Sequence, residues 1–326
     1  MKKLLALVLC LMMCATLVPS FAEGDVPSVA ICVAGTLGDR SFYDSANEGI
    51  EKLKADYGAN VTVIECKEDA SLYESSLYDA ADSYDVVCAV GWQFIDALPV
   101  VAADYPEVKF LFIDNELEEI PGNVMCVVYA QNEGSFLAGY IAGTLSETGK
   151  VGAVGGADDA TINDFIYGYR AGAEYAKEGT TVEVQYANDY EDPAKGKECA
   201  LALYSAGCDI VFQVAGKTGE GVFEAAAETG NYAIGVDGDQ KYINPDVILC
   251  SMVKCVGDSI YAVAVDMDNM FKGGEVWHAD MASGYIDVVY GTDDMVQQVS
   301  DELKAEVQEL KELVINGTIT VPTALN

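Results

Sequence analysis

The stretch VAICV-AGTLGDRS-FYDSANEGIEKLKADY, residues 29–57, begins as a short apolar run, passes through a glycine-bearing loop and continues as an amphipathic segment. A second apolar run, Val61–Glu65 (VTVIE), follows it. A short buried strand, a helix and another short strand in this order are typical of a β-α-β unit, in which the two strands pair in parallel.

The same alternation continues to residue 271. The predicted strands span residues 29–33, 61–65, 85–90, 109–113, 124–129, 150–154, 181–186, 209–214, 232–236 and 247–252. The predicted helices span residues 42–57, 71–83, 94–104, 134–145, 164–177, 193–206, 219–229 and 257–271. We therefore expect an α/β protein with doubly wound parallel sheets, helices on both sheet faces, and a ligand site at the carboxyl ends of the strands.

Composition excludes several classes of protein. The 326 residues include 18 Lys and Arg against 53 Asp and Glu, a formal charge of −35, so a basic face for DNA or RNA is excluded. The single histidine, His278, is too few for a multi-histidine metal site and is expected to lie at the surface without a role. A hydrophobic content of 51% excludes a disordered acidic chain. We expect no metal and no cofactor.

Residues 1–22 have the features of an export signal. Lys2 and Lys3 give a positively charged start, and Leu4–Val18 is an apolar run that is short for a membrane span. Small residues at the appropriate positions predict cleavage after Ala22. We therefore expect an exported protein of the cell surface or periplasm.

A lipid anchor would need a cysteine preceded by a small residue at the end of the apolar run. Cys10 follows Leu9 and Cys14 follows Met13, so neither gives a good lipid-attachment box. Lipidation and a peripheral association with the membrane remain alternatives to a free protein.

Eight of the ten cysteines lie beyond the export signal, and an even number in an exported protein is compatible with disulfides. Their settings favour free thiols instead. Cys32, Cys88 and Cys126 lie inside apolar runs, where cysteine behaves as a small hydrophobic residue. Cys250 and Cys255, the closest pair, are also expected to be unpaired.

Polar and aromatic residues follow the predicted strands. Ser41 suits a helix N-cap, with Asp44 three residues later as a partial capping box. Capping does not explain Phe42 and Tyr43 at the start of a helix, where an aromatic ring can stack on a planar ligand. Trp92 follows another strand, either as a rim or packing residue or as a ligand contact.

Asp237 is the clearest single indication of a ligand site, because a carboxylate directly after a buried strand does not contribute to packing. A carboxylate accepts two hydrogen bonds and suits a sugar diol. Lys254 lies among apolar residues at another strand end and needs either a carboxylate partner or a ligand oxygen. Pairing with Asp237 alone is the simpler alternative.

Two nucleotide-binding motifs are excluded. Lys217 and Thr218 follow Gly216, but a phosphate-binding loop needs a glycine where Val211 stands. The glycines at 152–156 do not match the dinucleotide-binding spacing.

Several ordered segments resemble the basic membrane protein family, whose members include purine nucleoside receptors of ABC transporters. The matching segments span residues 38–42, 105–114, 133–143, 149–156, 165–172, 209–216, 234–240 and 251–254. The resemblance implies a type I periplasmic-binding-protein fold, with two α/β lobes, three hinge crossings and the ligand in the cleft. We expect an N-terminal lobe of residues 23–128 plus 253–284 and a C-terminal lobe of residues 129–252 plus 285–326.

The resemblance also implies a ligand site. Phe42 and Phe212 resemble the two aromatic residues that sandwich the purine, and Asp237 and Lys254 resemble the pair that binds the ribose. Glu133 is a weaker candidate for reading purine N–H groups. The expected ligand-binding residues, taken together, are Asp39, Phe42, Tyr43, Trp92, Glu133, Phe212, Gly216, Asp237 and Lys254.

Two positions depart from the family pattern at the expected cleft. Tyr43 stands where the family usually has asparagine, and Lys217 stands where it usually has glycine. Tyr43 adds bulk and a hydroxyl group, and Lys217 adds a cation that could favour a more anionic ligand. Both leave the exact ligand open.

The expected function is capture of a nucleoside, with purines preferred, by lobe closure for an ABC permease. The expected protein is a monomer and not an enzyme. The alternatives are a receptor for a sugar or another small solute on the same fold, a signalling sensor, and, most remotely, a nucleoside hydrolase that uses acids such as Asp237 and Asp239.

Overall fold

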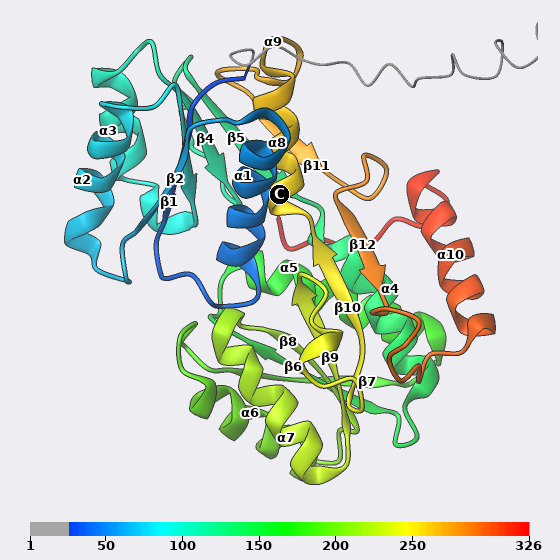
Figure 1. The fold of residues 1–326 in the computed structure, drawn as a ribbon. Coiled ribbons are helices and arrows are strands. Elements are labelled where there is room, and N and C mark those ends of the chain that lie inside the picture. Colours follow the sequence, from blue (N-terminus) through cyan, green and yellow to red (C-terminus); the bar gives the residue numbers. More distant parts are fainter. Residues whose placement is uncertain (1–25, 326) are drawn as a thin grey trace, which may run out of the picture.

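A computed structural model describes residues 26–325 of the chain (Figure 1). The expected export signal, its cleavage site after Ala22 and the two cysteines at positions 10 and 14 lie outside the described residues. Within residues 26–325, no helix combines the length and the apolar character needed to cross a membrane.

Two six-stranded sheets form the cores of two lobes. The first sheet has the order β11-β5-β4-β3-β1-β2, and the second has the order β12-β10-β9-β8-β6-β7. The first consists of β1 (Val29–Val33), β2 (Val61–Glu65), β3 (Val86–Val90), β4 (Lys109–Ile113), β5 (Val124–Tyr129) and β11 (Val276–Ala279). The second consists of β6 (Lys150–Gly155), β7 (Thr181–Tyr186), β8 (Ile210–Val214), β9 (Tyr232–Asp237), β10 (Ile248–Lys254) and β12 (Ile286–Val289).

Helices cover both faces of each sheet (Figure 1). In the first lobe, α1 and α8 pack together on one face and α2 and α3 on the other. In the second lobe, α4 and α5 form one pair and α6 and α7 the other. The bounds are α1 (Phe42–Tyr57), α2 (Ala70–Ala81), α3 (Ala97–Asp104), α4 (Gln131–Leu145), α5 (Ala160–Ala176), α6 (Pro193–Ser205), α7 (Glu220–Thr229), α8 (Val256–Val265), α9 (Met267–Met270) and α10 (Asp301–Ile315).

The chain passes between the lobes three times, after β5, after β10 and after β11. Within each sheet all pairings are parallel except the edge pair of β10 with β12, which is antiparallel. This arrangement confirms the predicted type I periplasmic-binding-protein fold with doubly wound parallel sheets. β1 shows why the strands could be predicted from short apolar runs: all five of its residues are apolar, and all five are buried.

The close pairing of α4 and α5 positions one wall of the space between the lobes. A β-carbon on Gly172 of α5 would lie only 1.9 Å from the backbone oxygen of Phe136 in α4. A β-carbon on Gly168 would lie 2.0 Å from the backbone oxygen of Asn132. These glycines therefore let the two helix backbones approach each other, which fixes where the N-terminal end of α5 lies.

The C-terminal segment returns to the middle of the molecule, where Figure 1 marks the end of the chain. Asn132 Nδ2 donates to the backbone oxygens of Val321 and Pro322, at 3.3 and 3.2 Å. Thr323 Oγ1 donates to Asp164 Oδ1 of α5 at 2.6 Å. The tail is thereby held against the α4–α5 pair, next to the crossings between the lobes.

All eight cysteines of the described part of the chain are free thiols. Cys32, Cys88 and Cys126 are fully buried in strands of the first sheet, and burial raises the pKa of each thiol. Cys250 and Cys255 are also unpaired.

Candidate functional site

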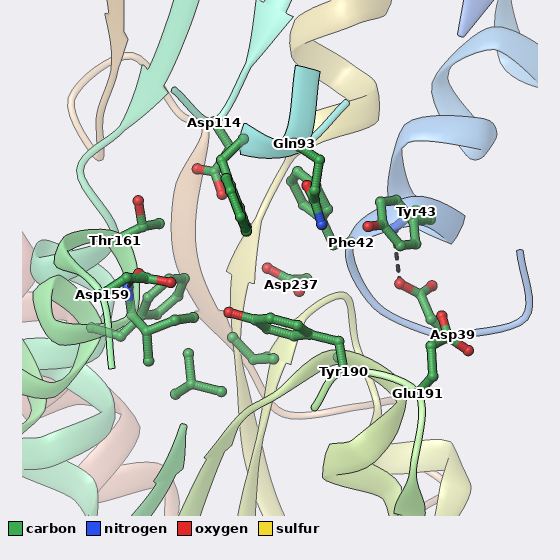
Figure 2. Close-up of a pocket in the computed structure, with 17 residues that line it drawn as sticks. Asp39, Phe42, Tyr43, Gln93, Asp114, Asp159, Thr161, Tyr190, Glu191 and Asp237 are labelled. Atoms are coloured by element: carbon green, nitrogen blue, oxygen red, sulfur yellow. Dashed lines mark hydrogen bonds between the residues drawn. The ribbon is translucent and has the colours of Figure 1, made fainter. Parts of the chain in front are cut away.

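A pocket lies between the two lobes, at the carboxyl ends of β1, β3 and β4 on one side and of β6, β8 and β9 on the other (Figure 2). It encloses about 750 Å³ of empty space, which includes its open mouth. The residues that line it are Asp39, Phe42, Tyr43, Gly91, Trp92, Gln93, Asp114, Asp159, Thr161, Ile162, Phe165, Tyr190, Glu191, Val214, Gly216, Val236 and Asp237. This is the position at which open α/β sheets bind ligands.

Asp39 organises the N-terminal end of α1. Its Oδ1 accepts hydrogen bonds from the backbone N–H groups of Ser41 and Asp44 at 3.0 Å each, and its Oδ2 accepts from that of Tyr43 at 2.9 Å. These bonds stabilise the carboxylate, but burial outweighs them and raises the pKa of Asp39 to about 7. Asp39 therefore fixes the backbone that carries Phe42 and Tyr43 into the pocket.

Ser41 stands at the predicted N-cap position of α1, but the capping hydrogen bond expected of its side chain is absent. Its side chain makes no capping bond with α1, because Asp39 satisfies those N–H groups. Ser41 Oγ instead donates to Asp237 Oδ2 of the opposite lobe at 2.5 Å. Asp44 also differs from a capping-box residue, because its carboxylate accepts from the backbone N–H groups of Gly38 and Arg40, at 2.8 Å each.

Lys254, at the end of β10, is not among the residues that line the pocket, but it contacts two carboxylates that do, those of Asp114 and Asp237. Its side chain is 3% exposed, and its Nζ lies 2.7 Å from Asp114 Oδ2 and 4.0 Å from Asp237 Oδ1. The ammonium group also lies 4.9 Å from the ring centre of Phe42 and 5.1 Å from that of Phe165. The cation is therefore shared between both lobes.

Asp114 was not predicted, yet it is the nearer carboxylate to Lys254. It directly follows β4, whereas Asp237 is the last residue of β9, and both residues have a positive φ, 68° and 64°. Burial raises the pKa of Asp114, although the Lys254 ammonium opposes that change. The same rule that selected Asp237, an acid directly after a buried strand, would also have found Asp114.

Aromatic rings enter the pocket from both lobes. Phe42 comes from α1 of the first lobe, and Tyr190 comes from the loop after β7 in the second (Figure 2). Phe165 of α5 also lines the pocket from the second lobe. Rings on opposite walls of a narrow pocket can stack on both faces of a flat ligand.

The structure does not bring Phe212 to the pocket. Phe212 is fully buried in β8, with its ring centre 5.1 Å from that of Tyr169 and 6.4 Å from that of Phe165. Val214, which is two residues further along the same face of β8, lines the pocket instead. Phe212 therefore lies too far from the carboxyl end of β8 to reach the pocket, and it packs against Phe165, which lines the pocket.

Tyr190 was missed because it lies in a loop with no hydrophobic periodicity. Its backbone oxygen accepts from the N–H of Thr218 at 3.1 Å, which ties this loop to the end of β8. A β-carbon on Gly156 would lie 2.1 Å from the Tyr190 ring, so the absence of a side chain there leaves room for the ring. Burial and the charges of Asp159 and Asp114 raise the pKa of Tyr190, which keeps the hydroxyl neutral.

Among the other predicted site residues, Tyr43, Trp92 and Gly216 line the pocket. Tyr43 is buried, and its ring centre lies 5.4 Å from that of Phe42. Trp92 stands at the rim with 54% exposure. Glu133 lies outside the lining, where its Oε2 accepts from the N–H of Met281 at 3.0 Å near a crossing between the lobes.

The pocket is rich in carboxyl groups. Five carboxyl groups line it, namely those of Asp39, Asp114, Asp159, Glu191 and Asp237. Lys254 is already paired with Asp114, and Lys217 lies outside the lining with its Nζ 3.5 Å from Glu191 Oε2. Within residues 26–325, no group of three or more His, Cys, Asp or Glu side chains is arranged to hold a metal ion. The site thus offers acceptors and aromatic faces rather than free cations.

Comparison with known proteins identifies the family of this chain. Residues 26–324 match the model of the Bmp family, described as ABC transporter substrate-binding protein PnrA-like. The chain is 34% identical to basic membrane protein A1 of Borrelia garinii, an alignment that covers 99% of this chain and 96% of the relative. It is 33% identical to basic membrane protein A of Borreliella burgdorferi, with 92% and 88% covered.

Solved structures agree with this assignment. A solute-binding protein of an ABC transporter system from Aeropyrum pernix superimposes with a TM-score of 0.82 at 26% identity, covering 92% of this chain and 94% of that one. A second ABC solute-binding protein, from Conexibacter woesei, has a TM-score of 0.74 at 25% identity, covering 92% and 99%. The chain belongs to the Bmp family of ABC transporter substrate-binding proteins.

Proposed function

We propose that this protein is the exported receptor of an ABC importer and that it captures a nucleoside, with purine nucleosides preferred, by closing its two lobes. The observation that carries the proposal is one pocket in which aromatic rings from opposite lobes meet carboxylates that follow buried strands. Phe42 and Tyr190 are proposed to cover the two faces of the base. Phe165, which also lines the pocket, is proposed to contact its edge. Stacking of a base on an aromatic ring contributes roughly 1–3 kcal/mol in nucleic-acid-binding proteins.

The ribose is proposed to lie against Asp237 and Lys254. Carboxylate oxygens accept the hydrogen bonds that a ribose diol donates, and the ammonium group can donate to a ribose oxygen. The neighbouring Asp114 neutralises Lys254, and among the described residues no Lys, Arg or His side chain lines the pocket. A phosphate would therefore meet carboxylates without a compensating charge, so we propose that the ligand is the nucleoside and not its phosphate.

The remaining parts of the proposal follow from the family. The receptor would act outside the cytoplasm as a monomer and present its closed form to the permease subunits, held at the membrane surface or free. Because β5 extends to Tyr129 and β10 to Lys254, the lobes would divide directly after these two residues, slightly later than expected, and near residues 284–285. Binding requires no bond to break in the ligand, so we propose that the protein is not an enzyme.

Thermal unfolding of residues 23–326 tests the proposal against adenosine, guanosine, inosine, uridine, free purines, ribose, glucose and adenosine monophosphate. A ligand at 100 times its Kd should stabilise the protein by about 2.7 kcal/mol, which is readily measured as a shift in Tm. We expect purine nucleosides to give the shift, and Phe42→Ala, Tyr190→Ala and Asp237→Ala to abolish it.

Tyr232→Ala is the matched control, because Tyr232 is exposed and stands at the start of β9, the end of the strand away from the pocket. That variant should respond as the unchanged protein does. A shift with ribose or glucose but with no nucleoside would move the substrate to a sugar on the same fold. Release of free base during incubation would support the hydrolase alternative and contradict simple capture.

A further inference from the structure

Gln240 follows the turn at residues 236–238, which we call the Asp237 turn. It lies in the second lobe and is 1% exposed. Its Oε1 accepts from the N–H of Val236 at 2.9 Å and from Gln213 Nε2 at 2.7 Å. Its Nε2 donates to the backbone oxygen of Arg40 at 2.9 Å, and Arg40 belongs to the first lobe. One buried side chain therefore joins the turn that carries Asp237 to the opposite lobe.

The network fixes the direction of this amide. Gln213 Oε1 accepts from the N–H of Ala215 at 3.1 Å, so the Nε2 of Gln213 is the group that faces Gln240. Gln240 must then present its oxygen to Gln213, which turns its own Nε2 toward the Arg40 carbonyl. Neither amide has a second low-energy orientation that satisfies these partners.

The same contacts hold the Asp237 turn. Asp237 has a positive φ of 64°, and the N–H of Gly238 donates to the oxygen of Val236 at 2.8 Å. The backbone N–H of Gln240 donates to Ser251 Oγ at 3.0 Å. Gln240 thus binds the turn on both sides of Asp237 and ties it to β10, which keeps the carboxylate aimed into the pocket.

The first lobe meets this turn through two adjacent residues. The Arg40 carbonyl accepts from Gln240, and Ser41 Oγ donates to Asp237 Oδ2 at 2.5 Å. Both contacts join residues of different lobes, so they form only when the lobes come together. Gln240 does not line the pocket and would act without touching a ligand.

We propose that Gln240 is a positioning residue that couples Asp237 to lobe closure. A ligand held by Asp237 stabilises the turn in the geometry in which Gln240 can reach Arg40, and the Arg40 bond in turn stabilises the closed state. The coupling holds for any ligand that uses Asp237, so it goes beyond the choice of nucleoside.

Trypsin provides a direct readout, because it cuts the Arg40–Ser41 peptide bond whose carbonyl Gln240 binds. When local opening is fast, cleavage follows the population of the open form. The test variant is Gln240→Glu, which has nearly the same shape and keeps both acceptor contacts. At pH 7.5 it places a carboxylate oxygen against the Arg40 carbonyl in place of a donor. We expect cleavage after Arg40 to become about tenfold faster, as loss of one buried hydrogen bond predicts.

Gln298→Glu is the matched control. Gln298 Nε2 also donates to backbone carbonyls, those of Pro245 and Asp246 at 2.8 and 2.9 Å, but within its own lobe. It should leave cleavage after Arg40 unchanged. Cleavage after the exposed Lys177 is the internal reference for unfolding of the second lobe.

Ser41→Ala removes the neighbouring bond between the lobes, from Ser41 Oγ to Asp237 Oδ2, and still tests the coupling of Asp237 to closure if Gln240→Glu unfolds the second lobe. It should also speed cleavage after Arg40 without changing cleavage after Lys177. Unchanged cleavage after Arg40 in Ser41→Ala and in a folded Gln240→Glu would overturn the coupling.

The association and dissociation rates of adenosine and guanosine provide a second test. Dissociation from Gln240→Glu should be about tenfold faster while association changes less than about twofold, because the bond forms after encounter. If no nucleoside binds the unchanged protein, the nucleoside proposal fails and the trypsin arm still decides the coupling. If a nucleoside binds and its dissociation rate is the same in both proteins, the coupling is rejected and the nucleoside proposal stands.

Discussion

Lys254 shows how a single side chain can hold the two lobes and the site together. It lies in the second lobe, its nearer carboxylate partner Asp114 lies in the first, and Asp237 stands on its other side. Lys254 and Asp237 are buried and the Asp114 side chain is 14% exposed, so each charge depends on the others for compensation. Removing one member of such a buried group leaves the other charges without compensation, which lowers the free energy of unfolding.

Replacing Lys254 with methionine should therefore destabilise the protein by about 3–5 kcal/mol at neutral pH, because Asp114 and Asp237 would stay buried without a cation. Urea unfolding measures the change. Lys217→Met is the control, since Lys217 is partly exposed and 3.5 Å from Glu191, and an exposed pair is worth at most about 1 kcal/mol. Equal losses in the two variants would contradict the assignment of Lys254 as a buried charge centre.

Part of the site could be predicted from single residues, and part could not. Asp237 and Lys254 stood out because a charged group next to a buried strand needs a partner, and the structure places them 4.0 Å apart. Tyr190 had no such signal, because its place depends on a loop that packs over Gly156 and is tied to Thr218. Phe212 resembled a ligand contact by its motif, yet its depth in β8 is a property of the whole sheet.

At the scale of elements, the α4–α5 pair determines the second wall of the pocket. Asp159 caps α5, with its Oδ1 accepting from the N–H of Ile162 at 2.9 Å, and Thr161 and Phe165 follow on the same helix. All four residues line the pocket. The position of this wall depends on the close contact between α5 and α4 at Gly168 and Gly172.

Gly172→Ala should separate the two helices. Its β-carbon would lie 1.9 Å from the Phe136 backbone oxygen, which cannot rotate away as a side chain could. Overpacking of this kind costs about 1–3 kcal/mol and outweighs the gain of alanine in helix propensity. We expect lower stability in urea unfolding and weaker ligand binding.

Gly122→Ala is the comparison, because a β-carbon there meets no atom within 4 Å. It should leave stability and binding almost unchanged. A Gly172→Ala variant as stable as the Gly122→Ala variant would show that the helices can move apart without cost.

Helices and strands with a clear repeating pattern of apolar residues could be predicted from the sequence. Those with few or scattered apolar residues could not. β11 and β12 are short edge strands with mixed burial, and each takes its place only by pairing with a neighbour already in its sheet. α10 buries one narrow stripe, which includes Leu303, Val307 and Leu310, amid a highly charged sequence. The predicted helix 257–271 is divided at Asp266 into α8 and α9.

For the molecule as a whole, the acidic surface is matched by an acidic interior. Burial raises the pKa of Asp39 to about 7, and it also raises the pKa values of Asp114, Glu133 and Asp164. Burial raises the pKa of Glu68 as well, and the nearby Glu191 adds to that change. These carboxyl groups cluster around the pocket and the crossings between the lobes, where closure removes them from water.

The effect on stability has a definite sign. A group with a raised pKa in the folded state keeps its proton to a higher pH than it does in the unfolded chain. The folded state then binds more protons, so the free energy of unfolding falls as pH rises from the ordinary value near 4 to about 7. Hydrogen bonds lower the pKa values of Asp69, Asp85 and Asp189, so those groups are already ionised and contribute a constant amount above pH 4.

We therefore expect the protein to be more stable at pH 5 than at pH 7.5, opposite to a protein whose buried carboxylates are mainly paired with cations. Urea unfolding at both values of pH, at one ionic strength, measures the difference. Asp39→Asn should reduce it, because asparagine has no proton to lose in this range, whereas Asp69→Asn should leave it unchanged. The mutual repulsion of a chain with a formal charge of −35 acts in the same direction but is screened by salt, so the part that persists at high salt belongs to the buried groups. Stability that rises with pH between these values would show that Asp39 and its neighbours are ionised without cost in the folded protein.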